Sequence, residues 1–260
     1  MGFRTLIAAC TLACLPGFAT AQAWLAGGSE WHPFSYSDAQ QQMQGIAVDI
    51  VREVLAQAGI QARFVSYPAN RMQVMLERGQ LDLSYAESRA WQNYEVADQY
   101  VFSEPYMKVR EYLFFARNNP AADKSIDALQ NLTIGMVRGY TYKRLDAAFA
   151  SQRLMKLETS QDIALFDLLD TGRVDAVAMV DDLYTYLTAT HHIDPSRFRR
   201  GAQLSEAPLS IMLQRKHAER LPAIDQAIRH MQDSGEIARI LDAHMPARTA
   251  VACNTQDPAC

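Results

Sequence analysis

The chain has 260 residues, of which 49% are apolar and 21% are charged, and its 29 acidic residues outnumber 25 basic ones. This composition supplies enough apolar surface for a packed core and argues against an intrinsically disordered chain. No stretch combines clustered basic residues with aromatic ones, so nucleic acid is not an expected partner.

The first 23 residues have the pattern of a secretory signal peptide. Arg4 precedes an uncharged, mostly apolar run over Thr5–Leu15, and small residues follow at 19–23. This order matches the charged, apolar and cleavage regions of such a leader, with cleavage after Ala21 or Ala23. A bilayer span needs about 20 apolar residues, so the run is too short to be an anchor. We therefore expect export to the periplasm.

Strands and amphipathic helices alternate along the next part of the chain. A strand at Leu25 leads into an aromatic loop, and a helix with a Val48-Val51-Val54 face follows. An alternating strand over Ile60–Tyr67 and a helix around Met72 come next. Strands that alternate with helices indicate a parallel sheet flanked by helices.

One pattern occurs twice. Residues 75–86 and 168–179 each read as the end of a helix, a glycine that terminates it, and a buried strand that begins at Asp82 or Asp175. Alternating strands and helices precede both copies, such as the strand Leu132–Val137 in the second. Two copies predict two lobes of similar architecture.

Extended apolar runs at Tyr112–Ala116 and Leu209–Leu213 bracket the second copy, and two helices then close the chain. Two crossings between the lobes make the first lobe discontinuous. We therefore predict an α/β fold of two lobes, each a mostly parallel sheet flanked by helices, with two hinge crossings and a cleft between. The expected division is the leader at 1–23, lobe 1 at 24–116 plus 214–246, lobe 2 at 117–213, and a tail at 247–260.

Two cysteines, Cys253 and Cys260, remain once the leader is removed. Oxidising compartments favour pairing of such residues, so we expect a disulfide that staples the tail. A metal or redox pair is the alternative, but no histidine lies nearby and the spacing is not C-x-x-C.

Common enzyme motifs are absent: the sequence contains no G-x-S-x-G, H-E-x-x-H, P-loop or G-x-G-x-x-G. The adjacent side chains of His191 and His192 diverge on any regular element, which favours a solvated turn over a metal site. We expect no catalytic residue, no metal and no cofactor.

Loops at the carboxyl ends of parallel strands are the expected ligand contacts. In lobe 1, Trp31 and Phe34 could form a stacking wall for a ligand; packing at the lobe edge is the alternative. In lobe 2, Gly139 and Tyr140 allow close backbone approach, and Thr141 with helix N-terminal amides suits a carboxylate. Thr141 could instead act only as a helix cap.

Three charged residues complete the candidate site. Arg71 and Arg89 could grip a carboxylate in bidentate fashion, although surface arginines are usually solvated. Asp181 and Asp182 end the strand that starts near Val174, and we take Asp181 as the partner of a ligand ammonium group while the other caps the following helix.

These stretches together resemble the family 3 extracellular solute-binding proteins, the periplasmic components of polar amino-acid ABC transporters. The resemblance runs from about Trp24 to Met245 and rests on six segments, residues 31–36, 45–50, 71–82, 102–106, 135–140 and 172–177. It implies the type II periplasmic-binding-protein fold with hinge closure on a small polar ligand, such as an amino acid or a related carboxylate or amine. It also implies a membrane ABC permease as partner and a monomeric chain without catalysis.

The chain departs from the family pattern at the ligand. A Thr-x-x-Arg motif holds the α-carboxylate in amino-acid binders of this family, but the arginine's place falls on Tyr94 here, and Arg89 could replace it only with a shifted loop. The place of the ammonium-binding aspartate is Val180, with Asp181 one residue later. These departures from the family pattern argue against recognition of an ordinary α-amino acid.

Two other functions stay open beside transport. An enzyme like the cyclohexadienyl dehydratases could use Glu87 or Glu30 as acid or base. A ligand sensor could dock on a separate membrane receptor.

Overall fold

The computed structural model describes residues 23–91 and 98–245. The expected leader and the tail with Cys253 and Cys260 lie outside these residues. The described strands are β1 Trp24–Gly28, β2 Tyr36–Ser37, β3 Met43–Gln44, β4 Ala62–Ser66, β5 Leu83–Glu87, β6 Tyr100–Phe102, β7 Met107–Ala116, β8 Leu132–Val137, β9 Leu154–Thr159, β10 Ala176–Val180 and β11 Phe198–Gln214. The helices are α1 Ile46–Gln57, α2 Ala69–Glu77, α3 Lys143–Ala150, α4 Ala164–Asp170, α5 Asp181–Thr190, α6 Leu221–Asp233 and α7 Glu236–His244.

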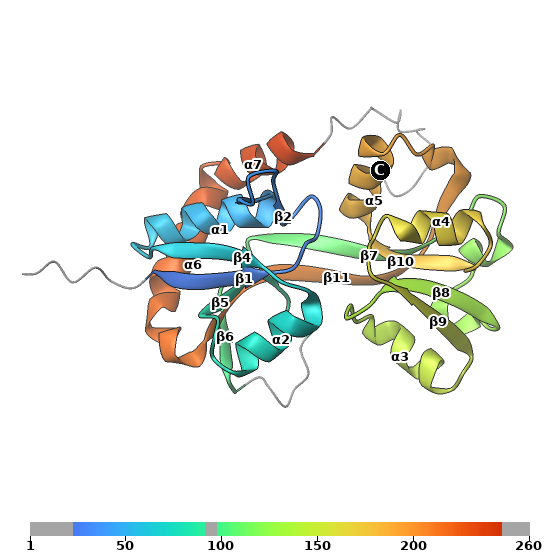
Figure 1. The fold of residues 1–260 in the computed structure, drawn as a ribbon, viewed down its shortest axis with the longest axis horizontal. Coiled ribbons are helices and arrows are strands. Elements are labelled where there is room, and N and C mark those ends of the chain that lie inside the picture. The colour runs from blue at the N-terminus through green and yellow to red at the C-terminus, as the bar shows by residue number, and fades with distance from the viewer. Residues whose placement is uncertain (1–22, 92–97, 246–260) are drawn as a thin grey trace, which may run out of the picture.

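Two groups of parallel strands define two lobes, which β7 and β11 join (Figure 1). In lobe 1, β1 pairs in parallel with β4 and β5; in lobe 2, β8 pairs in parallel with β9 and β10. The long strands β7 and β11 run antiparallel to each other and connect the groups into one curled path, β4-β1-β5-β11-β7-β10-β8-β9. The predicted two-lobed α/β fold is confirmed.

The strand pairings of β7 and β11 locate the two crossings between the lobes. Residues Glu111–Phe115 of β7 pair with β10 of lobe 2, whereas Ser210–Leu213 of β11 pair with β5 of lobe 1. Each crossing therefore lies within a hinge strand, before these pairings begin. An extended apolar segment can pair in either lobe, and only the register of its hydrogen bonds decides which.

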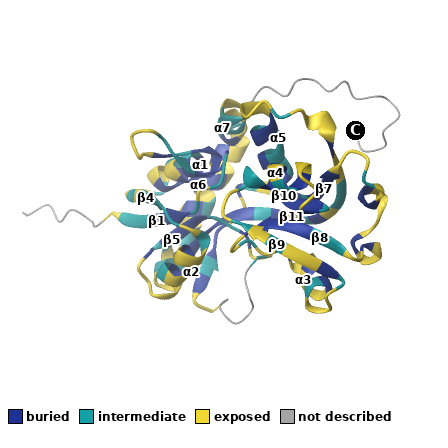
Figure 2. Cartoon of the chain, turned by 45° about the vertical axis from the view of Figure 1, so that its right-hand side comes forward, coloured by how far each residue is buried: buried dark blue, intermediate teal, exposed yellow. Residues whose placement is uncertain are grey.

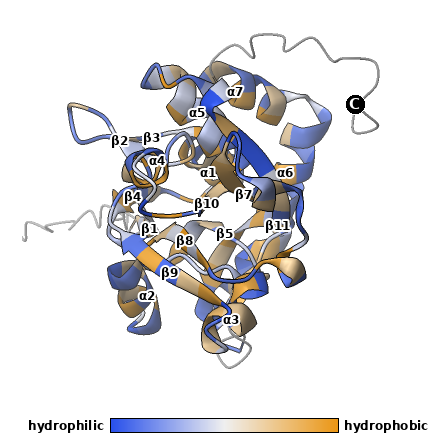
Figure 3. Ribbon diagram, turned by 90° about the vertical axis from the view of Figure 1, so that its right-hand side faces the viewer, coloured by the Kyte–Doolittle hydropathy of each residue, from blue (hydrophilic) through white to orange (hydrophobic). Residues whose placement is uncertain are grey.

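Apolar faces of the helices cover the sheets. The buried face of α1 includes Val48, Val51 and Val54, as their spacing predicts, and α6 and α7 pack against α1 to complete lobe 1. Figure 2 shows the buried residues gathered on the central strands, with exposed residues on the outer helices and loops. The edge strand β9 carries both apolar and polar residues, as the colours of Figure 3 show, and its Met155, Lys156 and Glu158 are exposed.

The repeated aspartates hold equivalent places in the two lobes. The backbone N–H of Leu25 in β1 donates to Asp82 Oδ2 over 2.9 Å, and that of Thr133 in β8 donates to Asp175 Oδ2 over 2.7 Å. Each aspartate thus fixes the start of its strand to the first strand of its lobe. The sequence repeat reflects a structural role, because both carboxylates lie at the amino ends of their strands.

No helix within residues 23–91 and 98–245 is both long and apolar enough to cross a membrane.

Candidate functional site

A cleft of about 290 Å³ lies between the two lobes. Lobe 1 contributes the end of β1 with Trp31, one face of α2 and the end of β5, while lobe 2 contributes the loop at 139–142 and the end of β10. Glu111 of the hinge strand β7 also lines it. The carboxyl ends of parallel strands thus face the cleft from both sides, as the fold class predicts.

Aromatic rings form the lobe 1 wall. Trp31 packs on Phe34 with ring centroids 4.3 Å apart and meets the edge of Trp91 at 6.1 Å. Trp31 and Trp91 line the cleft, whereas Phe34 is completely buried behind Trp31 and does not reach it. The structure therefore places Phe34 in the lobe core, as support for the tryptophan, instead of at the ligand.

Glu111 is a buried carboxyl group on the hinge. Its residue is only 6% exposed, and its strand neighbours are Ser205 on β11 and Val180 on β10. Burial raises the pKa of Glu111, although the Ser205 hydroxyl, which donates to Oε2, and the Trp91 indole N–H oppose this rise. The Trp91 Nε1 atom is itself buried without a well-formed hydrogen bond. The Ser205 hydroxyl therefore favours the ionised form of Glu111, against the effect of burial.

Asp162 supplies a second perturbed carboxyl group on the lobe 2 side. Burial raises the pKa of Asp162 to about 6, against a weaker opposing effect of its own backbone N–H. Tyr140 and Tyr142 lie near this carboxyl group, and burial raises their pKa values well above the usual range, so both hydroxyls stay protonated. A partly buried carboxyl group in a cleft of this kind is a candidate ligand contact.

Four of the eight predicted ligand-binding residues line the cleft: Trp31, Gly139, Tyr140 and Thr141. These residues follow the ends of β1 and β8, whereas the sequence patterns indicated none of the lining residues Glu111, Asp162 and Trp91. The sequence pattern around Glu111 could have identified it. Glu111 lies on the same face of its strand as the apolar residues Val109 and Leu113, and a charged residue on the buried face of a strand is unusual.

The predicted arginines do not reach the cleft. The guanidinium carbon of Arg71 lies 4.6 Å from the centre of the Tyr67 ring, and that of Arg89 lies 4.6 Å from the centre of Phe102. Both arginines are exposed. Within the described part of the chain, no arginine lines this cavity, whereas Arg138 lines the adjoining pocket. The direction of the Arg71 and Arg89 side chains was not determined by their spacing in the sequence.

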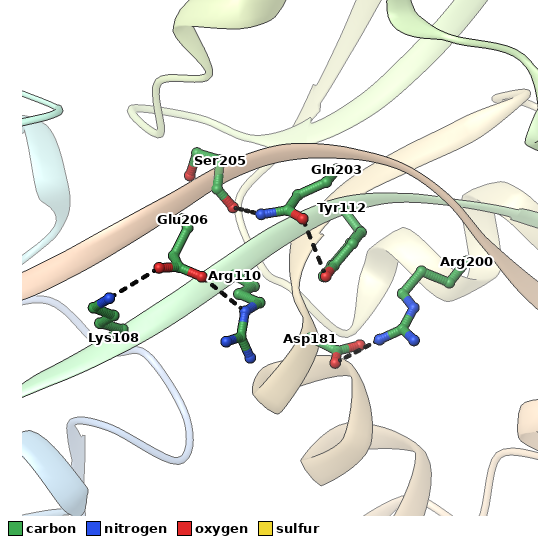
Figure 4. Close-up of polar contacts among 8 residues, drawn as sticks. All are labelled: Lys108, Arg110, Tyr112, Asp181, Arg200, Gln203, Ser205 and Glu206. Atoms are coloured by element: carbon green, nitrogen blue, oxygen red, sulfur yellow. Dashed lines mark hydrogen bonds and ion pairs between the residues drawn. The ribbon is translucent and has the colours of Figure 1, made fainter. Parts of the chain in front are cut away.

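Asp181 also points away from the cleft. Val180 ends β10 and lines the cleft, while Asp181 begins α5 and forms an ion pair with Arg200 Nη1 on β11 at 2.9 Å. Figure 4 shows this pair beside the polar side chains of the hinge strands, where Lys108 and Arg110 contact Glu206. The ammonium-binding role predicted for Asp181 is not supported by this position.

Gly139 brings the lobes together across the mouth of the cleft. Its φ of +89° is one that side chains rarely adopt, and a Cβ atom there would lie 2.9 Å from Asn70 Oδ1 and 3.2 Å from Ala69 Cβ in lobe 1. Gly139 therefore permits a close inter-lobe approach that any larger residue would obstruct.

Gly139→Ala should hold the lobes apart and weaken ligand binding by about tenfold, because closure then costs about 1.4 kcal/mol more. Titration calorimetry measures the affinity, and small-angle scattering measures the ligand-induced closure. Gly79→Ala is the matched control: Gly79 also has a left-handed φ of +65°, but no atom lies within 4 Å of its added Cβ. Equal affinities of the two variants would show that the contact does not govern closure.

In the described residues, no group of three or more His, Cys, Asp or Glu side chains is placed to hold a metal ion. The cleft instead combines aromatic faces with carboxylates, a surface suited to cationic organic solutes.

Comparisons with known proteins agree with this architecture. The model of the bacterial extracellular solute-binding proteins, family 3, matches residues 25–247. A comparison with curated protein sequences finds no match.

Three solved structures are similar to the chain. An ancestral arginine-binding protein bound to arginine is 19% identical with a TM-score of 0.72, over 86% of this chain and 98% of the other. An arginine transport-system periplasmic binding protein from Legionella pneumophila is 18% identical with a TM-score of 0.70, over 86% and 100%. A histidine kinase sensor domain with similarity to periplasmic binding proteins is 17% identical with a TM-score of 0.73, over 86% and 98%.

At these identities the structures share a fold, which confirms the predicted type II periplasmic-binding-protein architecture. The family match covers most of the sequence, including both lobes and the hinge strands. The chain belongs to family 3 of the bacterial extracellular solute-binding proteins.

Proposed function

We propose that the protein is a periplasmic binding protein that closes its lobes on a small amine-bearing solute and delivers it to a membrane ABC permease. The observation that carries this proposal is the inter-lobe cleft, with Trp31 and Trp91 as an aromatic wall and Glu111 as a buried carboxyl partner. A cation stacked on a tryptophan and paired with a carboxylate would be held by both interactions.

The hinge strands supply the means of closure. Two long strands, β7 and β11, link the lobes, and small backbone rotations within them can swing one lobe against the other. A ligand that contacts both lobes stabilises the closed arrangement, and the permease then distinguishes loaded from empty protein. The protein acts as a monomer, without cofactor or catalysis, after removal of its leader, and the tail cysteines pair.

The cleft tryptophans allow a direct test. The exported protein is titrated with a panel of amino acids, amines and carboxylates while its tryptophan fluorescence is followed. An amine-bearing compound should give a saturable change, accompanied by a smaller radius of gyration. Trp24→Phe should keep the signal, because Trp24 stacks on His217 and does not line the cleft, whereas Trp31→Phe should reduce it and leave only the contribution of Trp91.

Absence of saturable binding across the panel would contradict the proposal. Turnover of prephenate or arogenate would also contradict it, and would favour an enzyme on this fold. Mass spectrometry of the exported protein checks the location, since the expected product has lost its first 21 or 23 residues.

A further inference from the structure

The cleft carries more negative than positive side chains. Among the described residues that line it, five are acidic and a single one, Lys143, is basic. Charges in a narrow, partly dehydrated space interact more strongly than charges in bulk water. This lining favours a cationic solute and opposes one with negative groups.

The acidic side chains form two groups that act on different parts of the cavity. Burial and then the charges of Glu77 and Glu87 raise the pKa of Tyr100, on the lobe 1 side. Burial and then the charges of Glu111 and Asp162 raise the pKa of Tyr142, on the lobe 2 side. The placement of these residues agrees, because Glu77 and Glu87 end α2 and β5 of lobe 1, whereas Asp162 precedes α4 of lobe 2 and Glu111 pairs with β10 of that lobe. Carboxylates therefore line the cavity from both lobes.

Much of the remaining wall is apolar. Methionine and aliphatic side chains from both lobes line the same cavity: Met72, Leu76, Met179, Val180, Leu183 and Met212. Such a wall suits a methylene chain, because burial of its CH₂ groups away from water is favourable. The combination fits an elongated solute with polar ends.

A ligand carboxylate has few partners here. Arg71 and Arg89 lie over Tyr67 and Phe102, outside the cleft, and no arginine is among the described residues that line the cavity. Arg138 lines the adjoining pocket, where it pairs with Glu158 at 3.9 Å. Lys143 is exposed at the start of α3 and shares the cleft with Asp146 and Asp162. A carboxylate would therefore meet a net negative surface.

We propose that the cleft selects an elongated dication without a carboxylate, such as an α,ω-diamine or a guanidino-amine, with one cationic end at Glu111 and Asp162 and the other at Glu77 and Glu87. This inference rests on the proposed function and deepens it by naming the solute class. A volume of about 290 Å³ lies at the small end of ligand sites, which fits a short linear molecule.

Matched ligand pairs test whether a ligand carboxylate weakens binding and whether a second cationic group strengthens it. Calorimetric titration at neutral pH compares cadaverine with lysine, and agmatine with arginine, because each pair differs only by the α-carboxylate. It also compares cadaverine with pentylamine, which lacks the second ammonium group. The decarboxylated member and the diamine should each bind at least about tenfold more tightly than their partners, equivalent to about 1.4 kcal/mol.

Variants at each end locate the two ammonium groups. Glu87→Gln and Asp162→Asn should each reduce cadaverine affinity about tenfold and bring it toward the affinity for pentylamine. Glu206→Gln, on the outer face of the hinge, should leave cadaverine binding unchanged. Unfolding temperatures of all variants establish that the fold is intact.

Distinct outcomes separate the two proposals. Tighter binding of lysine or arginine than of the decarboxylated compounds, or equal binding of pentylamine and cadaverine, would overturn the dication inference and leave the proposed function standing. Failure of every amine and amino acid to bind would overturn both.

Discussion

Glu111→Gln should weaken binding of a cationic solute at least about thirtyfold at neutral pH, equivalent to about 2 kcal/mol. Glutamine preserves the shape of the side chain and can still accept from the Ser205 hydroxyl, so the main loss is the charge that faces the ligand. The group is buried on the hinge, where solvent screens the interaction little. Calorimetric titration of the variant and the parent protein gives the ratio.

The variant Glu206→Gln provides the matched control. Glu206 follows Ser205 on β11 and faces away from the cleft toward Lys108 and Arg110 (Figure 4), so Glu206→Gln removes an equal charge from the same strands. Affinity should stay within about twofold, as expected for an exposed ion pair. Equal losses in both variants would indicate a general effect of hinge charge instead of direct contact.

The thermal stability of Glu111→Gln should not fall with its affinity for the solute. Because burial raises the pKa of Glu111 in the folded state, its proton-linked stabilisation is present at low pH and is lost as pH rises through the folded pKa. At neutral pH the empty protein therefore gains nothing from the ionised group. The variant should unfold at the same temperature or a higher one, which distinguishes lost binding from misfolding.

Affinity for a cationic solute should rise about tenfold between about pH 5 and about pH 7.5. Burial raises the pKa of Asp162 to about 6, so this carboxyl group is mostly neutral at the lower pH and ionised at the higher one. A cation binds the ionised form, and binding in the lower range must release a proton. Titrations in buffers of different ionisation enthalpy measure both the affinity and the released protons.

Asp162→Asn isolates this effect. The variant should bind more weakly at high pH and show a shallower pH dependence, with only the contribution of Glu111 and the other cleft carboxylates remaining. An affinity in the parent protein that stays flat or falls as pH rises would contradict a role for Asp162 at the ligand. An unchanged pH profile in the variant would assign the dependence to another group.

The sequence by itself determined the architecture. The repeated helix–glycine–strand unit, whose strands begin at Asp82 and Asp175, predicted two similar lobes, because local periodicity and chain breaks depend on residues close together in the chain. The same reasoning placed Trp31, Gly139 and Thr141 at strand ends that line the cleft, since parallel strands share one carboxyl edge.

Only the tertiary structure decided which charges face the ligand. Arg71, Arg89 and Asp181 lie near the expected loops, yet their side chains contact Tyr67, Phe102 and Arg200, respectively, instead of facing the cleft. The burial of Glu111 depends on β11 and β10, strands that pair with it from distant parts of the chain. Side-chain direction and desolvation are properties of packed elements, so linear spacing located the cleft but did not determine its charge.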